Sequence, residues 1–136
     1  RRVPTDALAA ALGLAGCGQR YIAVELDRPE NLPQPVWVGV YFLSQESALE
    51  NYSNAELATE SRVEGADGVV HERVFAIKPG DRRQIELQEF DERIGWVEVA
   101  AGLPDRCARQ RIAVESGAKL RIMITVTETC IELTTD

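Results

Sequence analysis

Short segments in which apolar and polar residues alternate recur along this 136-residue chain, and this period of two constrains the fold most. The segment from Lys119 to Thr127 has the clearest alternation. Its apolar positions are Leu120, Ile122, Ile124 and Val126. Successive side chains of a β-strand point to opposite faces, so this pattern predicts a strand with one buried face.

Further strands are predicted by the same alternation and by runs rich in β-branched and aromatic residues. They lie at 21–26, 36–43, 69–77, 84–88 and 94–103, and a last short strand contains Ile131 and Leu133. Proline and glycine clusters between them are typical of turns. Only 44–60 has helical character. Seven or eight short strands predict an all-β fold, a two-layer antiparallel β-sandwich with a short helical insertion after the second strand.

The composition is that of a globular domain, with 45% hydrophobic and 27% charged residues. A formal net charge of −7 disfavours nucleic acid as a partner, because phosphate backbones repel an acidic surface. No apolar run reaches the roughly 18 residues that a transmembrane helix needs.

Residues 1–17 have the organisation of a secretory signal. Two arginines are followed by the uncharged run 7–16, which ends in small residues before Cys17. The sequence Leu14-Ala15-Gly16-Cys17 resembles the lipobox of bacterial lipoproteins. This resemblance implies cleavage before Cys17, attachment of lipid to its thiol, and a folded domain over 18–136. An ordinary N-terminal helix that contains Cys17 is the alternative.

Two cysteines remain after Cys17, namely Cys107 and Cys130. In an exported chain an even pair is most simply a disulfide, worth about 3–4 kcal/mol in chain-entropy models. Two unpaired buried thiols are the alternative. A zinc site is not expected, because two cysteines and the single histidine, His71, leave a tetrahedral shell incomplete. The sequence therefore predicts no metal and no cofactor.

Four segments follow one another in a distinctive order. The strand 36–43 contains a Tyr-x-Leu and leads into a short helical segment, and 75–80 ends in a Pro-Gly turn. The polar-apolar strand 83–87 comes next, and 94–101 combines a glycine with a run of small apolar residues. Together with the lipobox, this order resembles the TssJ family, the outer-membrane lipoproteins of type VI secretion systems. The chain departs from the family at 102–105, where it has Gly-Leu-Pro-Asp instead of Tyr-Arg-Asp.

This resemblance implies a transthyretin-like sandwich that is lipid-anchored at the periplasmic face of the outer membrane. It would bind the periplasmic C-terminal region of TssM, the inner-membrane component of the trans-envelope complex. The loop that matches the family's partner-binding loop, short in this chain, comprises Arg28, Pro29, Glu30, Asn31, Leu32, Pro33 and Gln34. Its prolines pre-set part of the backbone, and Leu32 is expected to be an exposed apolar anchor. A simple connecting loop is the alternative.

Catalysis is not expected. His71 lies within a predicted strand, and a nucleophilic pair with Cys107 would need a proximity that the sequence does not establish. The carboxylates Asp91-Glu92 lie in a polar turn typical of solvated charge, and 65–68 lacks the helix and lysine of a phosphate-binding loop. The remaining alternative is a periplasmic lipoprotein sandwich that binds a small ligand or inhibits a periplasmic enzyme.

Overall fold

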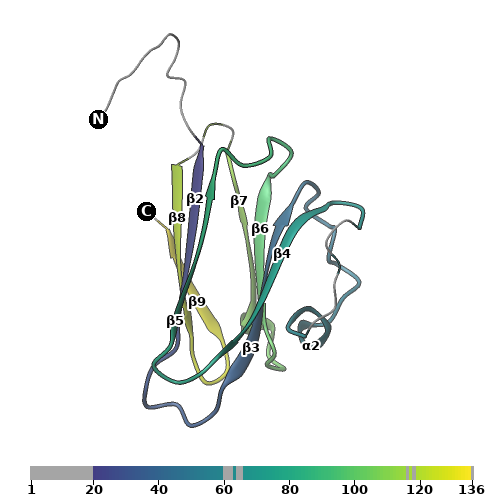
Figure 1. Ribbon diagram of the computed structural model, residues 1–136. Coiled ribbons are helices and arrows are strands. Elements are labelled where there is room, and N and C mark those ends of the chain that lie inside the picture. Colours follow the sequence, from purple (N-terminus) through teal and green to yellow (C-terminus); the bar gives the residue numbers. More distant parts are fainter. Residues whose placement is uncertain (1–19, 60–62, 64–65, 116, 118, 136) are drawn as a thin grey trace, which may run out of the picture.

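The computed structural model describes residues 20–59, 63, 66–115, 117 and 119–135, which form two four-stranded sheets packed face to face (Figure 1). The first sheet has the order β5 (Arg82–Gln88), β2 (Tyr21–Asp27), β8 (Lys119–Val126), β9 (Ile131–Thr135). The second has the order β4 (Val69–Ile77), β3 (Val36–Leu43), β6 (Trp96–Ala101), β7 (Arg109–Ala113). The predicted all-β sandwich is therefore confirmed.

The first sheet contains one parallel pair. β2 and β8 run in the same direction, with Tyr21 opposite Lys119 and Asp27 opposite Thr125. The other neighbouring strands in the two sheets are antiparallel. In this register the apolar residues of β2 lie opposite apolar residues of β8, as Val24 does opposite Ile122. The apolar side chains of the two strands therefore point to the same face of the sheet.

The core lies between the sheets, where the alternating faces meet. β2 and β8 contribute Ile22, Val24, Leu26, Ile122, Ile124 and Val126, all at most 1% exposed. From the opposite sheet, β3 and β6 contribute Val38, Val40, Phe42, Val97 and Val99, all fully buried. Burial of a branched aliphatic side chain contributes about 1.5–3 kcal/mol, so these faces supply the main driving force for the fold.

The strand β3 is buried on both faces. The segment 44–59 after this strand is the insertion. The outward side chains Tyr41 and Leu43 of β3 form a second apolar cluster with Leu49 and Leu57 of the insertion. The hydroxyl of Tyr41 donates to the carbonyl oxygen of Leu57. Gly39 lies on the same face, where an added Cβ would overlap that carbonyl and lie 2.6 Å from the Tyr41 ring. The doubly apolar sequence of 36–43 thus reflects an insertion packed over the outside of the sheet.

The helical character predicted over 44–60 is reduced to one turn, α2 (Asn54–Leu57). Ser53 caps it and forms a capping box, because its hydroxyl accepts from the N–H of Glu56 while the Glu56 carboxylate accepts from the N–H of Ser53. The segment before Ser53 forms successive turns, with N–H groups bonded three residues back. The Ser53-x-x-Glu56 signature therefore marks the start of the helix within the predicted segment 44–60.

The strand β7 was not predicted. Arg109 and Arg111 lie on one of its faces, which obscures the weaker apolar pattern on the other. It follows the 3₁₀ turn η1 (Arg106–Ala108), where Cys107 forms a disulfide with Cys130, which immediately precedes β9. The predicted disulfide is confirmed, and it joins edge strands of the two sheets.

The predicted signal segment 1–17, with its lipid-attachment residue Cys17, lies outside the described residues. In the part of the chain that the structure describes, none of the helices is long and apolar enough to cross a bilayer.

Candidate functional site

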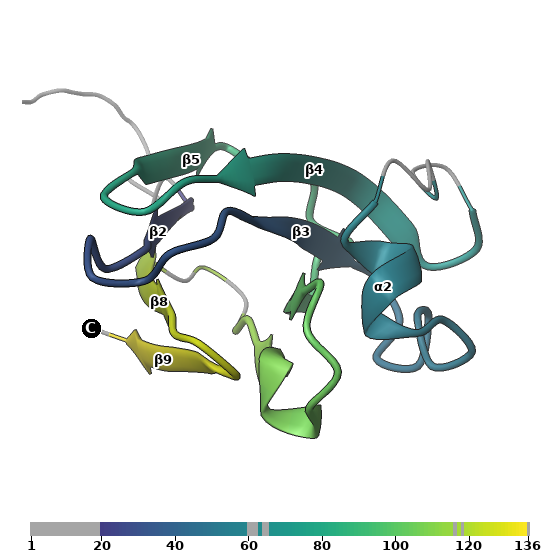
Figure 2. The same cartoon turned by 90° about the horizontal axis from the view of Figure 1, so that it is seen from below.

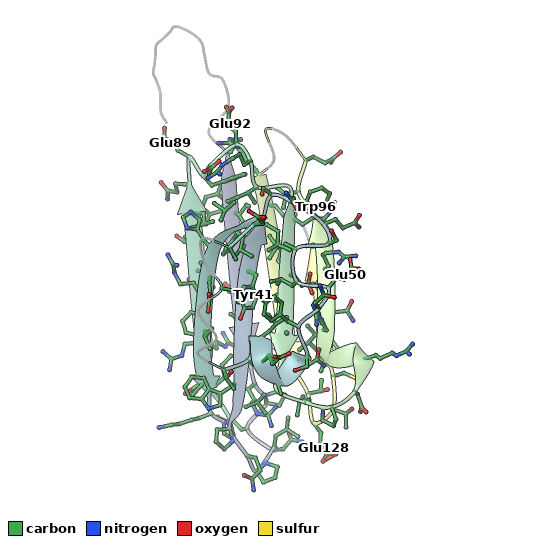
Figure 3. All side chains as sticks on the ribbon, turned by 90° about the vertical axis from the view of Figure 1, so that its right-hand side faces the viewer. Tyr41, Glu50, Glu89, Glu92, Trp96 and Glu128 are labelled. Carbon is green, nitrogen blue, oxygen red and sulfur yellow. A yellow bond between two sulfur atoms is a disulfide. The ribbon has the colours of Figure 1, made fainter. Side chains whose placement is uncertain are left out.

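The predicted docking loop 28–34 connects β2 to β3 at one end of the sandwich (Figure 1). The β4–β5 turn, the β8–β9 turn and the β6–η1 connection lie at the same end, which Figure 2 shows from below, and α2 lies beyond β3. The opposite end carries Arg20, whose guanidinium lies 4.2 Å from the centre of the Phe90 ring. Figure 3 labels Glu128 at the loop end, and Glu89 and Glu92 at the end near Arg20.

Arg28, the first residue of this loop, is 3% exposed. Its Nε donates to the carbonyl oxygen of Gln34 at 2.9 Å, and its Nη1 donates to the carbonyls of Val126 and Thr127 at 3.0 and 2.9 Å. Burial lowers the pKa of the guanidinium. Arg28 therefore ties both ends of the loop to the β8–β9 turn, where the sequence suggested only a contact residue.

The remaining loop residues differ in their exposure. Glu30, Asn31, Pro33 and Gln34 are exposed, whereas Pro29 and Leu32 are half-buried. The N–H of Gly80 donates to the carbonyl oxygen of Arg28 at 2.7 Å, and the N–H of Leu32 bonds to Pro29. Leu32 was expected to be an exposed anchor and presents only part of its side chain.

A groove with a volume of about 450 Å³ lies next to the loop. Its apolar lining comes from three segments. The first contains Pro33 of the loop with Pro35, Val36 and Trp37 directly after it, the second contains Ala55 and Ala58 of the insertion, and the third contains Leu103 after β6. Arg28 and Glu128 also line it. Trp37 is 47% exposed and is one of two large exposed hydrophobic side chains in the described chain. An open apolar groove with an exposed tryptophan is typical of a protein-docking surface.

Hydrogen bonds connect the walls of this groove. The side-chain amide of Asn54 donates to the carbonyl oxygens of Leu103 and Asp105 at 3.0 and 3.1 Å. The N–H of Gly102 donates to the carbonyl of Trp37 at 2.8 Å. Three segments that are distant in the sequence thus form one connected surface, which a single-sequence pattern does not reveal.

Trp37 lies within the predicted strand 36–43. It begins the outward face of β3, the face that carries Gly39 and Tyr41. The insertion packs on this face from Gly39 onward, where the carbonyl of Leu57 lies against Gly39. It does not cover Trp37, which remains exposed. The exposure of Trp37 therefore depends on where the insertion ends.

The groups considered for catalysis are accounted for by other contacts. His71 on β4 packs edge-on against Phe42, with ring centroids 6.4 Å apart, and Cys107 is committed to its disulfide. The Asp91 carboxylate accepts hydrogen bonds from the side chain and backbone of Arg93, which lower its pKa to about 2. Within the described residues, no three His, Cys, Asp or Glu side chains gather as metal ligands would.

No protein-family model matches the sequence, and no curated protein matches it. Among solved structures, the type VI secretion system (T6SS) lipoprotein TssJ1 from Pseudomonas aeruginosa matches with a TM-score of 0.72 and 20% identity, over 86% of this chain and 96% of that one. Serratia marcescens Lip, a membrane-bound T6SS component, has a TM-score of 0.69 and 11% identity, over 85% and 97%.

A third structure is that of the T6SS protein TssM C-terminal domain (869–1107) from EAEC. The match has a TM-score of 0.62 and 15% identity, and it covers 85% of this chain and 98% of the matched chain. At these identities the likeness concerns the fold. The chain therefore has the fold of the type VI secretion lipoproteins TssJ1 and Lip, as the resemblance in its sequence implied.

Proposed function

We propose that this protein is a TssJ-family lipoprotein of a type VI secretion trans-envelope complex. Lipid on Cys17 would hold it to the periplasmic face of the outer membrane, and the loop end of the sandwich would bind the periplasmic C-terminal region of a TssM-type protein. Its role would be to connect two membranes, without a chemical reaction. The fold that it shares with TssJ1 and Lip supports this assignment.

The observation that carries the proposal is the position of the apolar groove. Trp37 and loop 28–34 lie at the end of the sandwich opposite Arg20, and Arg20 follows Cys17 by only three residues. A chain anchored at Cys17 would therefore hold Arg20 near the membrane and direct the groove away from it, toward the periplasm. That is where an inner-membrane protein would present its periplasmic domain.

The match in the TssM structure gives further support. A structure of the TssM C-terminal domain and a structure of a type VI membrane complex both contain a chain that matches this fold with a TM-score of 0.62. This is consistent with a role beside a TssM-type protein.

Capture of the partner tests the docking role. Protein that begins at residue 18 is immobilised and exposed to the folded periplasmic fragment of the TssM-type protein from the same genome. We expect saturable capture, weakened by Leu32→Asp because a charge in a half-buried position disrupts apolar contact. The exposed Asn31→Asp serves as the matched charge control. A folded fragment that is not captured would remove the docking role.

Membrane fractionation tests the anchor separately. The full protein should sediment with outer membranes, and Cys17→Ser should release it, because attachment would depend on acyl chains. Fractionation that is unchanged by this substitution would contradict lipid attachment at Cys17.

A further inference from the structure

The buried guanidinium of Arg28 has no anionic partner among the described residues. The structure contains two buried charged residues in its described part, Arg28 and Glu98. Glu98 forms ion pairs with Arg109 and Arg111. Arg28 bonds only to three backbone carbonyls, and no described carboxylate lies within 4.0 Å of it. Burying a charge without a counter-charge costs free energy of folding. Arg28 carries this cost, whereas Glu98 does not.

One part of the guanidinium remains available. Nε and Nη1 make all of the hydrogen bonds that Arg28 forms in the described chain, and Nη2 makes none. Arg28 also lines the groove that contains Trp37. The three bonds through Nε and Nη1 fix the orientation of the planar group, so Nη2 is a pre-oriented donor that does not need to be ordered on binding.

Glu128 is the carboxylate that lines the same groove as Arg28, and it is exposed. It follows Thr127, whose carbonyl Arg28 binds, yet its carboxylate forms no ion pair with the guanidinium. The backbone carbonyls give Arg28 partial compensation only. Burial consequently lowers the pKa of Arg28, with no opposing effect from a neighbouring carboxylate.

We propose that the groove binds an Asp or Glu side chain of the partner on Arg28, with an adjacent apolar side chain packed against Trp37 and Leu103. This inference rests on the proposed docking function and specifies the chemistry of the docked segment. A charge-assisted hydrogen bond to a carboxylate is about twice as strong as a neutral one, and it gains further strength where water is excluded.

The surrounding charges restrict which segments fit. The protein carries a net charge of −7, and the exposed Glu128 lines the groove, so a generally acidic segment is repelled. Only a carboxylate that reaches Arg28 itself gains a cationic partner. The groove therefore selects a single acidic side chain flanked by apolar or basic residues, an arrangement in which repulsion contributes to specificity.

Variants of this protein provide the first arm of the test, with the TssM-type periplasmic fragment as the probe. Arg28→Gln removes the charge and keeps one amide donor group near the position of Nε, and we expect affinity to fall by about tenfold or more. Arg82→Gln is the matched control, because it removes the same charge from an exposed arginine of β5 that pairs with Asp27 at 3.3 Å. Glu128→Gln should bind equally or more tightly, because it removes a repulsive neighbour.

The second arm leaves this protein unchanged, so it gives a result even if Arg28→Gln does not fold. Each Asp and Glu in the part of the fragment that is protected on binding is changed to Asn or Gln. We expect one such change to reproduce the Arg28→Gln loss, and the two changes together to cost little more than either alone. A fragment amidated at its C-terminus should bind normally, since the proposed carboxylate is a side chain.

The outcomes separate the two proposals. Capture that is insensitive to every partner carboxylate, or equally sensitive to Arg28→Gln and Arg82→Gln, would overturn the carboxylate site while the docking function stands. Loss of binding on C-terminal amidation alone would also overturn it, in favour of a terminal carboxylate. A fragment that never binds would remove the docking function itself.

Discussion

The carboxylate of Glu98 on β6 accepts a hydrogen bond from Nε of Arg109 on the neighbouring strand β7. The other two nitrogens of this guanidinium donate to the carbonyl oxygens of Tyr52 and Leu49 in the insertion. One buried carboxylate thus orients the arginine that fastens the insertion to the sheet. Because Ala55 and Ala58 of the insertion form a wall of the groove, this pair also supports the candidate docking surface.

We expect Glu98→Ala to lower the free energy of unfolding by about 2–4 kcal/mol, because it leaves a partly buried guanidinium without its counter-charge. Amide hydrogen exchange should accelerate most over 45–59, the segment that Arg109 holds. Glu25→Ala is the control, since Glu25 and Arg121 form an exposed pair 3.6 Å apart. That control should cost under about 1 kcal/mol. Equal protection of 45–59 in both variants would show that Glu98 does not fasten the insertion.

Gly39→Ala should be strongly destabilising, although Ala is the smallest possible addition. The new Cβ would overlap the carbonyl of Leu57 and crowd the ring of Tyr41, which forces the insertion away from β3. Overpacking of this kind costs about 1–3 kcal/mol. Gly95→Ala is the matched control, because nothing lies within 4 Å of its added Cβ. Urea unfolding of the two variants checks the difference, and similar midpoints would contradict this close approach.

The disulfide should contribute measurably to stability. Cys107 and Cys130 are 23 residues apart, and closing a loop of this size stabilises a fold by about 3–4 kcal/mol in chain-entropy models. We expect Cys107→Ser with Cys130→Ser to lower the unfolding free energy by that amount and to leave the sandwich assembled. Alkylation of the native, unreduced domain should detect no free thiol. Two thiols that react before unfolding would exclude the bond.

Trp37→Ala should separate docking from folding. Trp37 is 47% exposed, so only about half of its surface is buried, and we expect the unfolding free energy to fall by about 1–3 kcal/mol while the domain stays folded. Affinity for the TssM-type fragment should fall by more than about tenfold, as for a tryptophan hot spot. Met123→Ala tests specificity, because Met123 is 44% exposed but lies on β8 in the other sheet. Equal effects of the two substitutions on capture would place the interface elsewhere.

The Asp91 turn should produce a defined pH dependence. Hydrogen bonds from Arg93 lower the pKa of Asp91 from 3.8 to about 2 in the folded protein. The folded state therefore favours the carboxylate, and its contribution is complete above pH 3.8 and is lost as the pH falls through 2. Asp91→Asn should lower Tm by a constant amount near neutral pH, and this difference should shrink toward pH 2. A difference that is independent of pH would exclude the ionised pair as its source.

The strands could be predicted where one face is buried, because alternation reports directly on that burial. The bounds 36–43 and 69–77 are those of β3 and β4. β7 escaped prediction because its outward face carries two arginines, Arg109 and Arg111, which pair with the buried Glu98 of the neighbouring strand. Such a polar face is set by a partner on another strand, and local alternation does not report it. The candidate site was predicted only in part, since loop 28–34 is continuous in sequence, whereas Trp37, Leu103 and Ala58 meet only in the folded chain.

The sequence by itself determined the sandwich, its core faces and the cysteine pair, because these depend on local period, turn residues and residue count. Only the tertiary structure decided that Arg28 is a buried cation and that Trp37 is exposed. Both outcomes depend on other segments of the chain. The carbonyls at the β8–β9 turn bind Arg28, and the insertion packs on β3 at Gly39 but does not cover Trp37. Solvent exposure is a property of all surrounding segments together, and no local pattern specifies it.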